Sequence, residues 1–390
     1  MKYLIIATLF LFVYSCKSGN SKDESGILVI RPDIKNISTC VIDQITGDYL
    51  CLNVEMPEGR LLGMITHVVP FEEWLLLYDE YERQIHIFTR EGQHVNTLEA
   101  LGRGPGEYMG LDCFAVDAIK RQLIIYERPR KQFHYYTVPE LEYQKSDRIG
   151  KYLVCFSPID STTMFVVSDE DVQEKGMPQV YMGPRWYDTN THELFDAEIE
   201  YNVISSEFSM PQAIMRFADA VFCIHPHLVS TMYHLSSRHA EPFLQIDFGQ
   251  NSGGKGFWKT TDYSSIPQQV NDLKMALMPH HFLFSDKFYS FCFFFYSVGF
   301  ESPAICIYDI ESGNNHCYQK IEFRGIEIKQ LRIVGTVDDY YLCLFYPYEC
   351  TIDPEEVAKS EISTLIKTKL DNCKDEGTPI MFMFKPKFKR

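Results

Sequence analysis

Residues 74–79 read Trp74-Leu75-Leu76-Leu77-Tyr78-Asp79, and a polar turn joins them to Ile85-His86-Ile87-Phe88. Apolar, β-branched and aromatic residues dominate both runs, a composition that favours strands. Each run is too short for an average helix and is bounded by polar turn residues. The two runs therefore predict a pair of antiparallel strands.

The same order of strands recurs along the chain. The nearest copy comprises Phe114-Ala115-Val116-Asp117, Leu123-Ile124-Ile125-Tyr126 and Phe133-His134-Tyr135-Tyr136. Four fainter copies pair Met164–Val167 with Arg185–Asp188, Ala220–Ile224 with Thr231–Leu235, Ser290–Tyr296 with Ile305–Asp309, and Tyr340–Tyr346 with Ile380–Phe384. Repeats of about 40 to 60 residues indicate solenoids or propellers, and no series of long helices alternates with the strands. We expect an all-β protein, a β-propeller of six blades, with seven blades as the alternative.

Two segments depart from the strand pattern. Ile266–Met278 carries apolar residues at helical spacing, with Pro267 near its start. Asp353–Leu370 begins with Asp353 as an N-cap, followed by Pro354 in the first turn and two glutamates. They predict two short helical insertions that pack on the rim of the propeller. The alternative is that a helix docks a partner.

The N-terminus predicts export. Lys2 precedes an apolar run, Leu4–Val13, that falls short of the roughly 20 residues of a membrane-spanning helix. The run leads to Ser15 and Cys16, which resemble a lipobox. We therefore expect residues 1–15 to be a signal peptide and the thiol of Cys16 to be lipidated. The alternative is an ordinary signal peptide with an incidental cysteine.

The stretch after Cys16 predicts a flexible tether over residues 16–26, because residues 17–26 offer no apolar side chain to a core. Within it, Lys22-Asp23-Glu24 resembles a signal that sends lipoproteins to the outer leaflet of the outer membrane. We expect an outer-membrane lipoprotein, facing either the periplasm or the cell surface, with membrane attachment through the lipid at Cys16. Residues 27–390 are expected to form the propeller domain.

Composition narrows the classes of partner. The net charge is −16, which excludes a nucleic-acid partner, because phosphate binding needs concentrated Lys and Arg. Aromatic residues make up 14% of the chain, as suits buried strands. Cysteines after Cys16 number eleven and many lie in apolar runs such as Phe291-Cys292-Phe293, so most are expected to be buried thiols. No Cys-x-x-Cys pair occurs to suggest a zinc or redox site.

The most distinctive motif is Gly102-Arg103-Gly104-Pro105-Gly106-Glu107-Tyr108. It looks like the inter-blade signature of NHL-type propellers and resembles, more closely, the six-bladed β-propeller lipoproteins of gut-type Gram-negative anaerobes. The segment Thr378–Lys385 is similar to the last strand of that family. The function of those lipoproteins is largely unassigned, so the resemblance implies a fold and an anchor but no catalytic residues.

The motif has a structural and a ligand-binding interpretation. Its glycines allow positive φ angles and close backbone approach, while Pro105 stiffens the turn. It matches neither a dinucleotide fingerprint nor a P-loop. In the structural interpretation, Arg103 and Glu107 bond to the neighbouring backbone of a tight connection between blades. In the other, Arg103, Glu107 and Tyr108 are ligand-binding residues.

Trp258 is a further ligand-binding candidate, because it follows the glycine-rich run 253–256 as an aromatic loop tip does in carbohydrate-binding loops. Packing of Trp258 on the rim is the structural alternative. A metal could recruit His225, His227 and the pair His280-His281, but turns around neighbouring prolines explain these residues equally. We predict no metal or cofactor.

Carboxylate pairs at Glu72-Glu73 and Asp338-Asp339 adjoin turns, where solvated acids are common, and nothing marks either pair as an acid and base. Two functions of different classes follow. The favoured one is a non-catalytic binding or scaffold module at the cell envelope, with a glycan, a peptide or an envelope protein as ligand. The alternative is a propeller enzyme that resembles lactonases and lyases and acts at the central channel.

Overall fold

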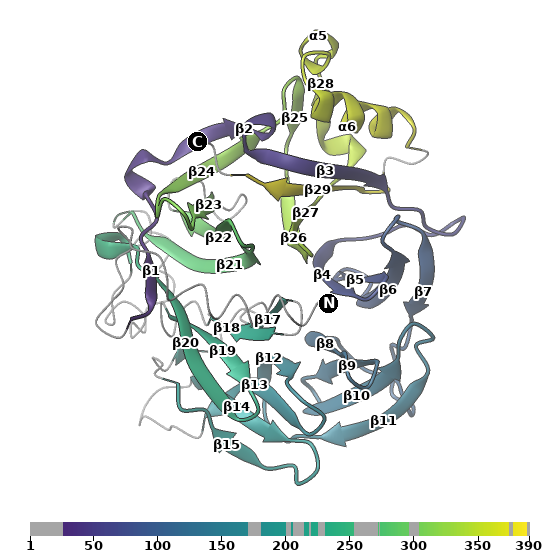
Figure 1. Ribbon diagram of the computed structural model, residues 1–390. Coiled ribbons are helices and arrows are strands. Elements are labelled where there is room, and N and C mark those ends of the chain that lie inside the picture. The colour runs from purple at the N-terminus through teal and green to yellow at the C-terminus, as the bar shows by residue number, and fades with distance from the viewer. Residues whose placement is uncertain are drawn as a thin grey trace.

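The computed structural model describes residues 26–170, 181–199, 204–205, 214–217, 220–224, 231–252, 272, 274–295, 304–373 and 377–387. Its strands form six radial sheets of four or five strands, arranged in a ring (Figure 1). The protein is thus a six-bladed β-propeller, as the repeats predict, and the alternative of seven blades is wrong.

Blades 1 to 3 follow the order of the chain. Blade 1 contains β4 (Ile65–Phe71), β5 (Trp74–Asp79), β6 (Gln84–Thr89) and β7 (His94–Leu98). Blade 2 contains β8 (Cys113–Asp117), β9 (Gln122–Glu127), β10 (Gln132–Thr137) and β11 (Tyr143–Arg148). Blade 3 contains β12 (Leu153–Pro158), β13 (Thr163–Glu170), β14 (Tyr181–Asp188), β15 (Leu194–Asp196) and the short β16 (Ile204–Ser205) beside β14.

Blades 4 to 6 recruit strands from the N-terminal segment. Blade 4 contains β17 (Ile214–Phe217), β18 (Ala220–Cys223), β19 (Thr231–Ser236), β20 (His239–Ile246) and β1 (Leu28–Ile30). Blade 5 contains β21 (Ala276–Phe284), β22 (Phe288–Phe295), β23 (Ala304–Asp309), β24 (Asn315–Glu322) and β2 (Ser38–Val41). Blade 6 contains β26 (Arg332–Val337), β27 (Tyr340–Phe345), β29 (Ile380–Pro386) and β3 (Thr46–Asn53).

The middle strands of each blade are buried on both faces, which explains their continuous apolar runs. In blade 1, Leu75, Leu76 and Leu77 of β5 are all at most 1% exposed, although successive side chains point to opposite faces. One face packs in the core shared with blade 6, and the other in the core shared with blade 2. The cores therefore lie between neighbouring blades.

The ring closes in blade 6, where the N-terminal β3 pairs with the C-terminal β29. The antiparallel register places Phe382 opposite Cys51 and Ile380 opposite Asn53. Closure of this kind leaves no unpaired blade at the junction of the two chain ends. The predicted meeting of the N-terminal strands with Ile380–Phe384 is confirmed.

Residues 28–53, here called the N-terminal strap, run along the outer edges of three consecutive blades (Figure 1). β1 lies parallel to β20, with Leu28 opposite Leu244, and β2 lies parallel to β24. Between them, the Asn315 side chain donates to the carbonyl of Arg31 and accepts from the amide of Asp33, at 2.9 and 2.7 Å. The strap then closes blade 6 as β3.

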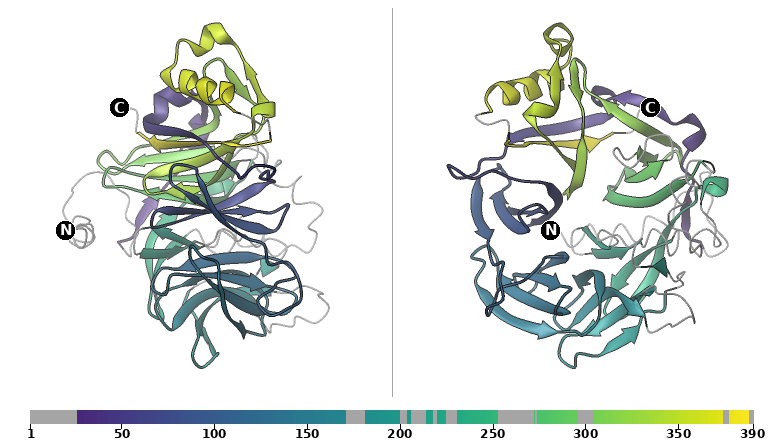
Figure 2. Two further views of the ribbon diagram at one scale, coloured as in Figure 1. Left: turned by 90° about the vertical axis from the view of Figure 1, so that its right-hand side faces the viewer. Right: turned by 180° about the vertical axis from the view of Figure 1, so that it is seen from behind.

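The helices are few and short in the described residues. They are α2 (Ile42–Ile45), α5 (Pro354–Val357) and α6 (Glu361–Asp371), with 3-10 turns at Ile34–Asn36, Gly249–Asn251 and Pro347–Glu349. α5 and α6 project from blade 6 at the rim, together with a small antiparallel sheet of β25 (Ile326–Ile328) and β28 (Cys350–Ile352) (Figure 2). None of the described helices is long and apolar enough to cross a membrane.

The insertion predicted at Asp353–Leu370 exists, but as two helices. Asp353 is the N-cap of α5, since its side chain accepts from two backbone amides. The chain then turns at Ala358, and the Ser360 hydroxyl caps α6 by accepting from the amide of Ser363. Most of the helix predicted at Ile266–Met278 lies outside the described residues, and its last three residues belong to β21 instead.

All eleven cysteines after Cys16 are described, and all carry free thiols, nine of them buried. Burial raises the pKa of Cys40, Cys51 and Cys223 to about 12. These thiols are therefore neutral at pH 7 and act as small apolar side chains, as their positions in apolar runs predict.

Candidate functional site

The loop Gly102–Tyr108 connects β7 of blade 1 to β8 of blade 2. Two backbone bonds close it at its base: Gly102 N–H donates to the carbonyl of Tyr108, and Tyr108 N–H to that of Ala100, at 3.0 and 2.8 Å. Inside the loop, the Glu107 carboxylate accepts from the amide of Gly104 at 2.7 Å. A Cβ on Gly102 would overlap that carboxylate. Glu107 thus makes a backbone bond of the kind that the structural interpretation expects, and its role as a ligand-binding residue stays a prediction.

Gly106 occupies the one position of this loop with a positive φ, +77°. A Cβ there would lie 2.7 Å from Cγ of Tyr143 in β11. Glycine is thus required twice, for the left-handed backbone and for the approach of the tyrosine ring. The motif therefore joins the two blades through a close contact.

Tyr108 is fully buried in the core between blades 1 and 2. Its hydroxyl donates toward the carbonyls of Arg83 and Leu98, at 3.0 and 3.3 Å. Burial raises its pKa. Tyr108 anchors the loop, because its ring is buried in the core and its hydroxyl bonds to backbone carbonyls. This position does not agree with the predicted direct contact between Tyr108 and a ligand.

Arg103 is exposed at the tip of the loop. Its carbonyl accepts from the Arg130 guanidinium at 3.4 Å, but its own guanidinium has no partner among the residues that the structure describes. The bond from Arg103 to neighbouring backbone, expected in the structural interpretation, is therefore not found there. Its role as a ligand-binding residue stays a prediction.

A cleft of about 640 Å³ lies beside the loop, between blades 1 and 2. Blade 1 contributes the outer strand β7 and the residues that follow it, and blade 2 contributes the turn between β10 and β11. Its lining includes the polar and aromatic side chains of Arg60, His94, Thr97, Glu99, Glu140 and Tyr143. Pro105 and Gly106 of the glycine-rich loop also line it.

On the blade 1 side, a buried carboxylate, an imidazole and a hydroxyl form a chain that ends in the cleft. Asp79 Oδ2 lies 3.8 Å from Nε2 of His86, whose Nδ1 is 3.0 Å from the hydroxyl of Thr97. That hydroxyl is also 2.7 Å from Nε2 of His94. Burial alone would raise the pKa of Asp79, but the nearby imidazole of His86 and the hydrogen bonds from the amides of Glu82 and Gly63 lower it. The carboxylate is therefore ionised at neutral pH.

Blade 2 repeats this chain of groups at matching strand positions. Glu127, which is fully buried, accepts from Nε2 of His134 at 2.8 Å, and Nδ1 of His134 is 3.0 Å from the hydroxyl of Ser146. The Ser146 hydroxyl is 2.9 Å from the hydroxyl of Tyr143, at the cleft. Each histidine faces its hydroxyl partner as a cross-strand pair, His86 opposite Thr97 and His134 opposite Ser146. Repetition in two blades indicates that the chains position the outer strands, and with them the wall of the cleft.

These two chains of groups were not among the residues singled out in the sequence. The signal was present, because the acid ends the second strand of each blade, and the histidine is the third residue of the third strand. The hydroxyl residue, which lies on the outer strand, is Thr97 in one blade and Ser146 in the other. Nothing in a single copy distinguishes these residues from ordinary strand residues.

The inner strands carry a second group of imidazoles. Burial lowers the pKa of His67 in β4 to about 4, and burial with the nearby His280 and His67 lowers that of His281 well below its usual value. His281 has a φ of +48°, where the register of β21 is irregular. Within the described ranges, no three His, Cys, Asp or Glu side chains lie close enough to hold a metal ion together. His225 and His227 lie outside those ranges.

The paired acids form surface ion pairs. Arg121 donates to both carboxylate oxygens of Glu72 at 2.5 Å. Arg90 contacts Asp338, and Lys385 contacts Asp339, both at 2.6 Å. These contacts agree with the solvated turns expected from the sequence.

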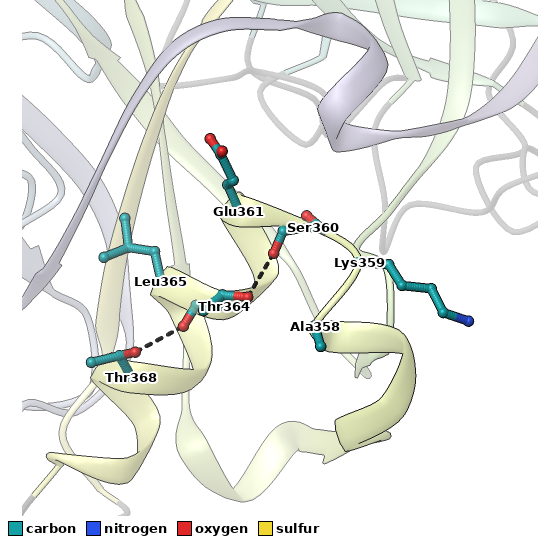
Figure 3. Close-up of a pocket in the computed structure, with 7 residues that line it drawn as sticks. All are labelled: Ala358, Lys359, Ser360, Glu361, Thr364, Leu365 and Thr368. Carbon is teal, nitrogen blue, oxygen red and sulfur yellow. Dashed lines mark hydrogen bonds between the residues drawn. The ribbon is translucent and has the colours of Figure 1, made fainter.

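A second hollow, of about 470 Å³, lies on the insertion of blade 6 (Figure 3). Its polar groups bond within the helix: the Thr364 hydroxyl donates to the carbonyl of Ser360, and the Thr368 hydroxyl to that of Thr364, at 2.8 and 2.9 Å. It is formed by one turn and one helix, so we take the cleft between blades 1 and 2 as the candidate site. Two other candidates, Cys16 and Trp258, lie outside the described residues.

Comparison with known proteins gives a family match over almost the whole ring. The family described as a domain of unknown function, DUF4934, matches residues 28–385. A candidate exported protein of Bacteroides fragilis NCTC 9343 superposes with a TM-score of 0.67 at 15% identity, covering 92% of this chain and 99% of that one. A member of the DUF4221 family from Bacteroides vulgatus ATCC 8482 gives a TM-score of 0.50 at 10% identity, with 88% and 98% covered. No curated protein matches the sequence. At these identities the solved structures support the fold alone.

Proposed function

The chain belongs to DUF4934, a family of domains of unknown function, and on that premise we propose that it is a non-catalytic binding module of the cell envelope. We place its ligand, a glycan, a peptide or another envelope protein, in the cleft between blades 1 and 2. The observation that carries the proposal is the construction of this cleft from two rigid blades and a loop that is bonded at both ends.

Preorganisation supports binding at this place. The cleft walls are strands whose side chains are fixed by two buried chains of hydrogen-bonding groups, ending at Thr97 and Tyr143. A ligand therefore meets groups that lose little freedom when it binds. The cleft volume is also within the range of about 300 to 1,000 Å³ that is usual for small-molecule and cofactor sites.

An enzyme acting at the central channel is the alternative proposal. The channel strands carry His67, His280 and His281, and the low pKa of His67 keeps it neutral at pH 7. Catalysis of this kind needs several acids or histidines that converge, and no three His, Cys, Asp or Glu side chains in the described ranges gather closely enough to hold a metal ion, so we favour binding.

We propose attachment to the outer membrane through a lipid on Cys16. The lipobox-like sequence supports it, and the candidate exported protein with the same fold is compatible with an envelope location. Two or three acyl chains suffice for stable anchoring, since each buried methylene contributes about 0.8 kcal/mol. Cys16→Ala is expected to release the protein from membranes and to abolish palmitate labelling. Labelling of the variant would refute lipidation at this thiol.

The binding proposal is tested by filling the cleft. Glu140 is exposed at its mouth, so Glu140→Trp adds bulk without removing a buried group. Glu361→Trp is the matched control, because it places the same ring at the hollow beside α6. Hydrogen exchange of residues 94–106 and 139–143 is measured with separate glycan and peptide fractions of an envelope extract. Protection that Glu140→Trp removes and Glu361→Trp retains supports the proposal; protection that survives Glu140→Trp refutes this location.

A further inference from the structure

Tyr143 presents a fixed aromatic surface in the cleft. The side chain is 41% exposed, yet three contacts hold it. The base of the ring packs against Gly106, and its edge meets the ring of Tyr136 at a centroid distance of 5.9 Å and an interplanar angle of 63°. Its hydroxyl is held 2.9 Å from that of Ser146. An exposed ring that cannot turn is a ready platform for the apolar face of a flat ligand.

The polar groups beside this ring can both donate and accept hydrogen bonds. The Thr97 hydroxyl and Nε2 of His94 are 2.7 Å apart. Burial, with the charges of nearby His86 and Arg60, lowers the pKa of His94, so its ring is neutral at pH 7. A hydroxyl has one donor and two acceptor positions, and the imidazoles of His86 and His94 use two of these three. A sugar hydroxyl, which can donate or accept, can bond to Thr97 through the remaining position.

The charges of the cleft are largely paired before a ligand arrives. Arg60 and Glu99 form an ion pair, with side chains 48% and 44% exposed. Glu140 adds one exposed carboxylate, and a single solvated ion pair with it would contribute only about 0 to 1 kcal/mol. An ionic ligand therefore gains little here, whereas the paired guanidinium and carboxylate offer donors and acceptors to neutral hydroxyls.

The backbone of β7 is poorly suited to an added peptide strand. The amide of His94 donates to the carbonyl of Glu55 at 3.3 Å, and that of Thr97 donates to the Asn96 side chain at 2.9 Å. The Asn96 amide nitrogen in turn donates to the carbonyls of Pro139 and Glu140, at 3.1 and 2.9 Å. Strand addition relies on main-chain hydrogen bonds, and these donors are already used by the chain itself.

We infer that the cleft between blades 1 and 2 binds a neutral oligosaccharide, with one sugar ring on Tyr143 and its hydroxyls on Thr97, His94 and the Arg60–Glu99 pair. The inference rests on the proposed function and specifies its ligand class. Tyr143, Thr97 and His94 are the specificity-determining residues in this arrangement.

The experiment uses the mature chain, residues 16–390, on an array of immobilised hexasaccharides. The neutral probes are cellohexaose, maltohexaose, mannohexaose, xylohexaose and chitohexaose; hexagalacturonate and a random hexapeptide mixture are the charged and peptide comparators. Tyr143→Ala removes the platform and Tyr143→Phe keeps the ring without its hydroxyl. Tyr81→Ala, at an aromatic residue that is 79% exposed and outside the cleft, is the control.

We expect at least one neutral hexasaccharide to bind, with affinity falling about tenfold or more in Tyr143→Ala, roughly 1.4 kcal/mol, and unchanged in Tyr81→Ala. Binding should also persist from 0.05 to 0.5 M salt, because it involves no net charge. If only hexagalacturonate or the peptide mixture binds, and Glu140→Trp removes this binding, the inference is overturned and the proposed function stands. If no probe binds in a manner that Glu140→Trp removes, both are overturned.

Discussion

Replacing Gly106 by alanine is expected to destabilise the propeller through two separable effects. The first is backbone strain, because a residue with a Cβ at φ +77° costs roughly 1–2 kcal/mol. The second is steric, because the new Cβ would lie 2.7 Å from Cγ of Tyr143, whose ring is held by Ser146 and Tyr136. Forcing such a side chain aside costs typically about 1–3 kcal/mol. Together the loss is about 2–5 kcal/mol.

Two further glycines and one double variant separate these effects. Gly59 has a φ of +80° and no atom within 4 Å of a Cβ, so Gly59→Ala measures backbone strain alone. Gly102 is not at a positive φ, yet its Cβ would overlap the Glu107 carboxylate, so Gly102→Ala measures the cost of displacing a close side chain, with its bond to Gly104, without backbone strain. In a Tyr143→Ala background, Gly106→Ala should cost no more than Gly59→Ala does in the native chain.

Urea unfolding followed by fluorescence and by far-UV circular dichroism gives the free energies, provided that the two transitions coincide. If Gly106→Ala and Gly59→Ala lower the free energy of unfolding of the otherwise native chain by the same amount, the steric half of the reasoning is refuted. An unchanged cost after removal of the Tyr143 ring would refute it too, because the double-variant cycle would then show no coupling.

Three further outcomes are expected. A chain that ends at Thr378 lacks β29 and should lose cooperative unfolding of the whole ring; melting like that of the full mature chain would contradict the closure seen in blade 6. Arg103→Ala should leave the melting temperature unchanged, since its guanidinium has no partner in the described residues, and a clear drop would indicate a structural contact. The pKa of His67 falls from 6.5 to about 4 on folding, so the unfolded chain binds more protons between these values and stability should decline as pH falls from 6.5 to 4. In pH-dependent unfolding, His67→Gln should have a shallower decline, and an identical slope would exclude this residue as its source.

The fold could be predicted because each blade is a local unit. Strands β5 and β6 are neighbours in sequence, both are buried on two faces, and their apolar runs are visible without any long-range information. The break between α5 and α6 was harder to predict, because the apolar stripe of Asp353–Leu370 continues across it. Ser360 marks the start of the second helix. This role becomes evident only in the structure, where its hydroxyl accepts from the amide of Ser363.

The candidate site was only partly predictable. The glycine-rich loop stood out because three glycines around Pro105 demand an unusual backbone, and Glu107 does bond within it. Tyr108 could not be assigned, since an aromatic residue beside a loop is equally compatible with a ligand contact and with burial. The sequence contains no signal that singles out Tyr143. Its role depends on Gly106, which lies in the connection between β7 and β8 and contacts Tyr143 only in the folded propeller.

The N-terminal strap has a consequence for the order in which the protein acquires its structure. β1, β2 and β3 are made first, but their partners β20, β24 and β29 emerge from the ribosome only after most of the chain has been synthesised. The first strands of the domain therefore have no native partner for most of the synthesis, and contacts of such large sequence separation form slowly. Blades 1 and 2, whose pairings are all local, can assemble early. The ring itself is completed last, when the final strand arrives, so a nascent or translocating chain remains open until the end.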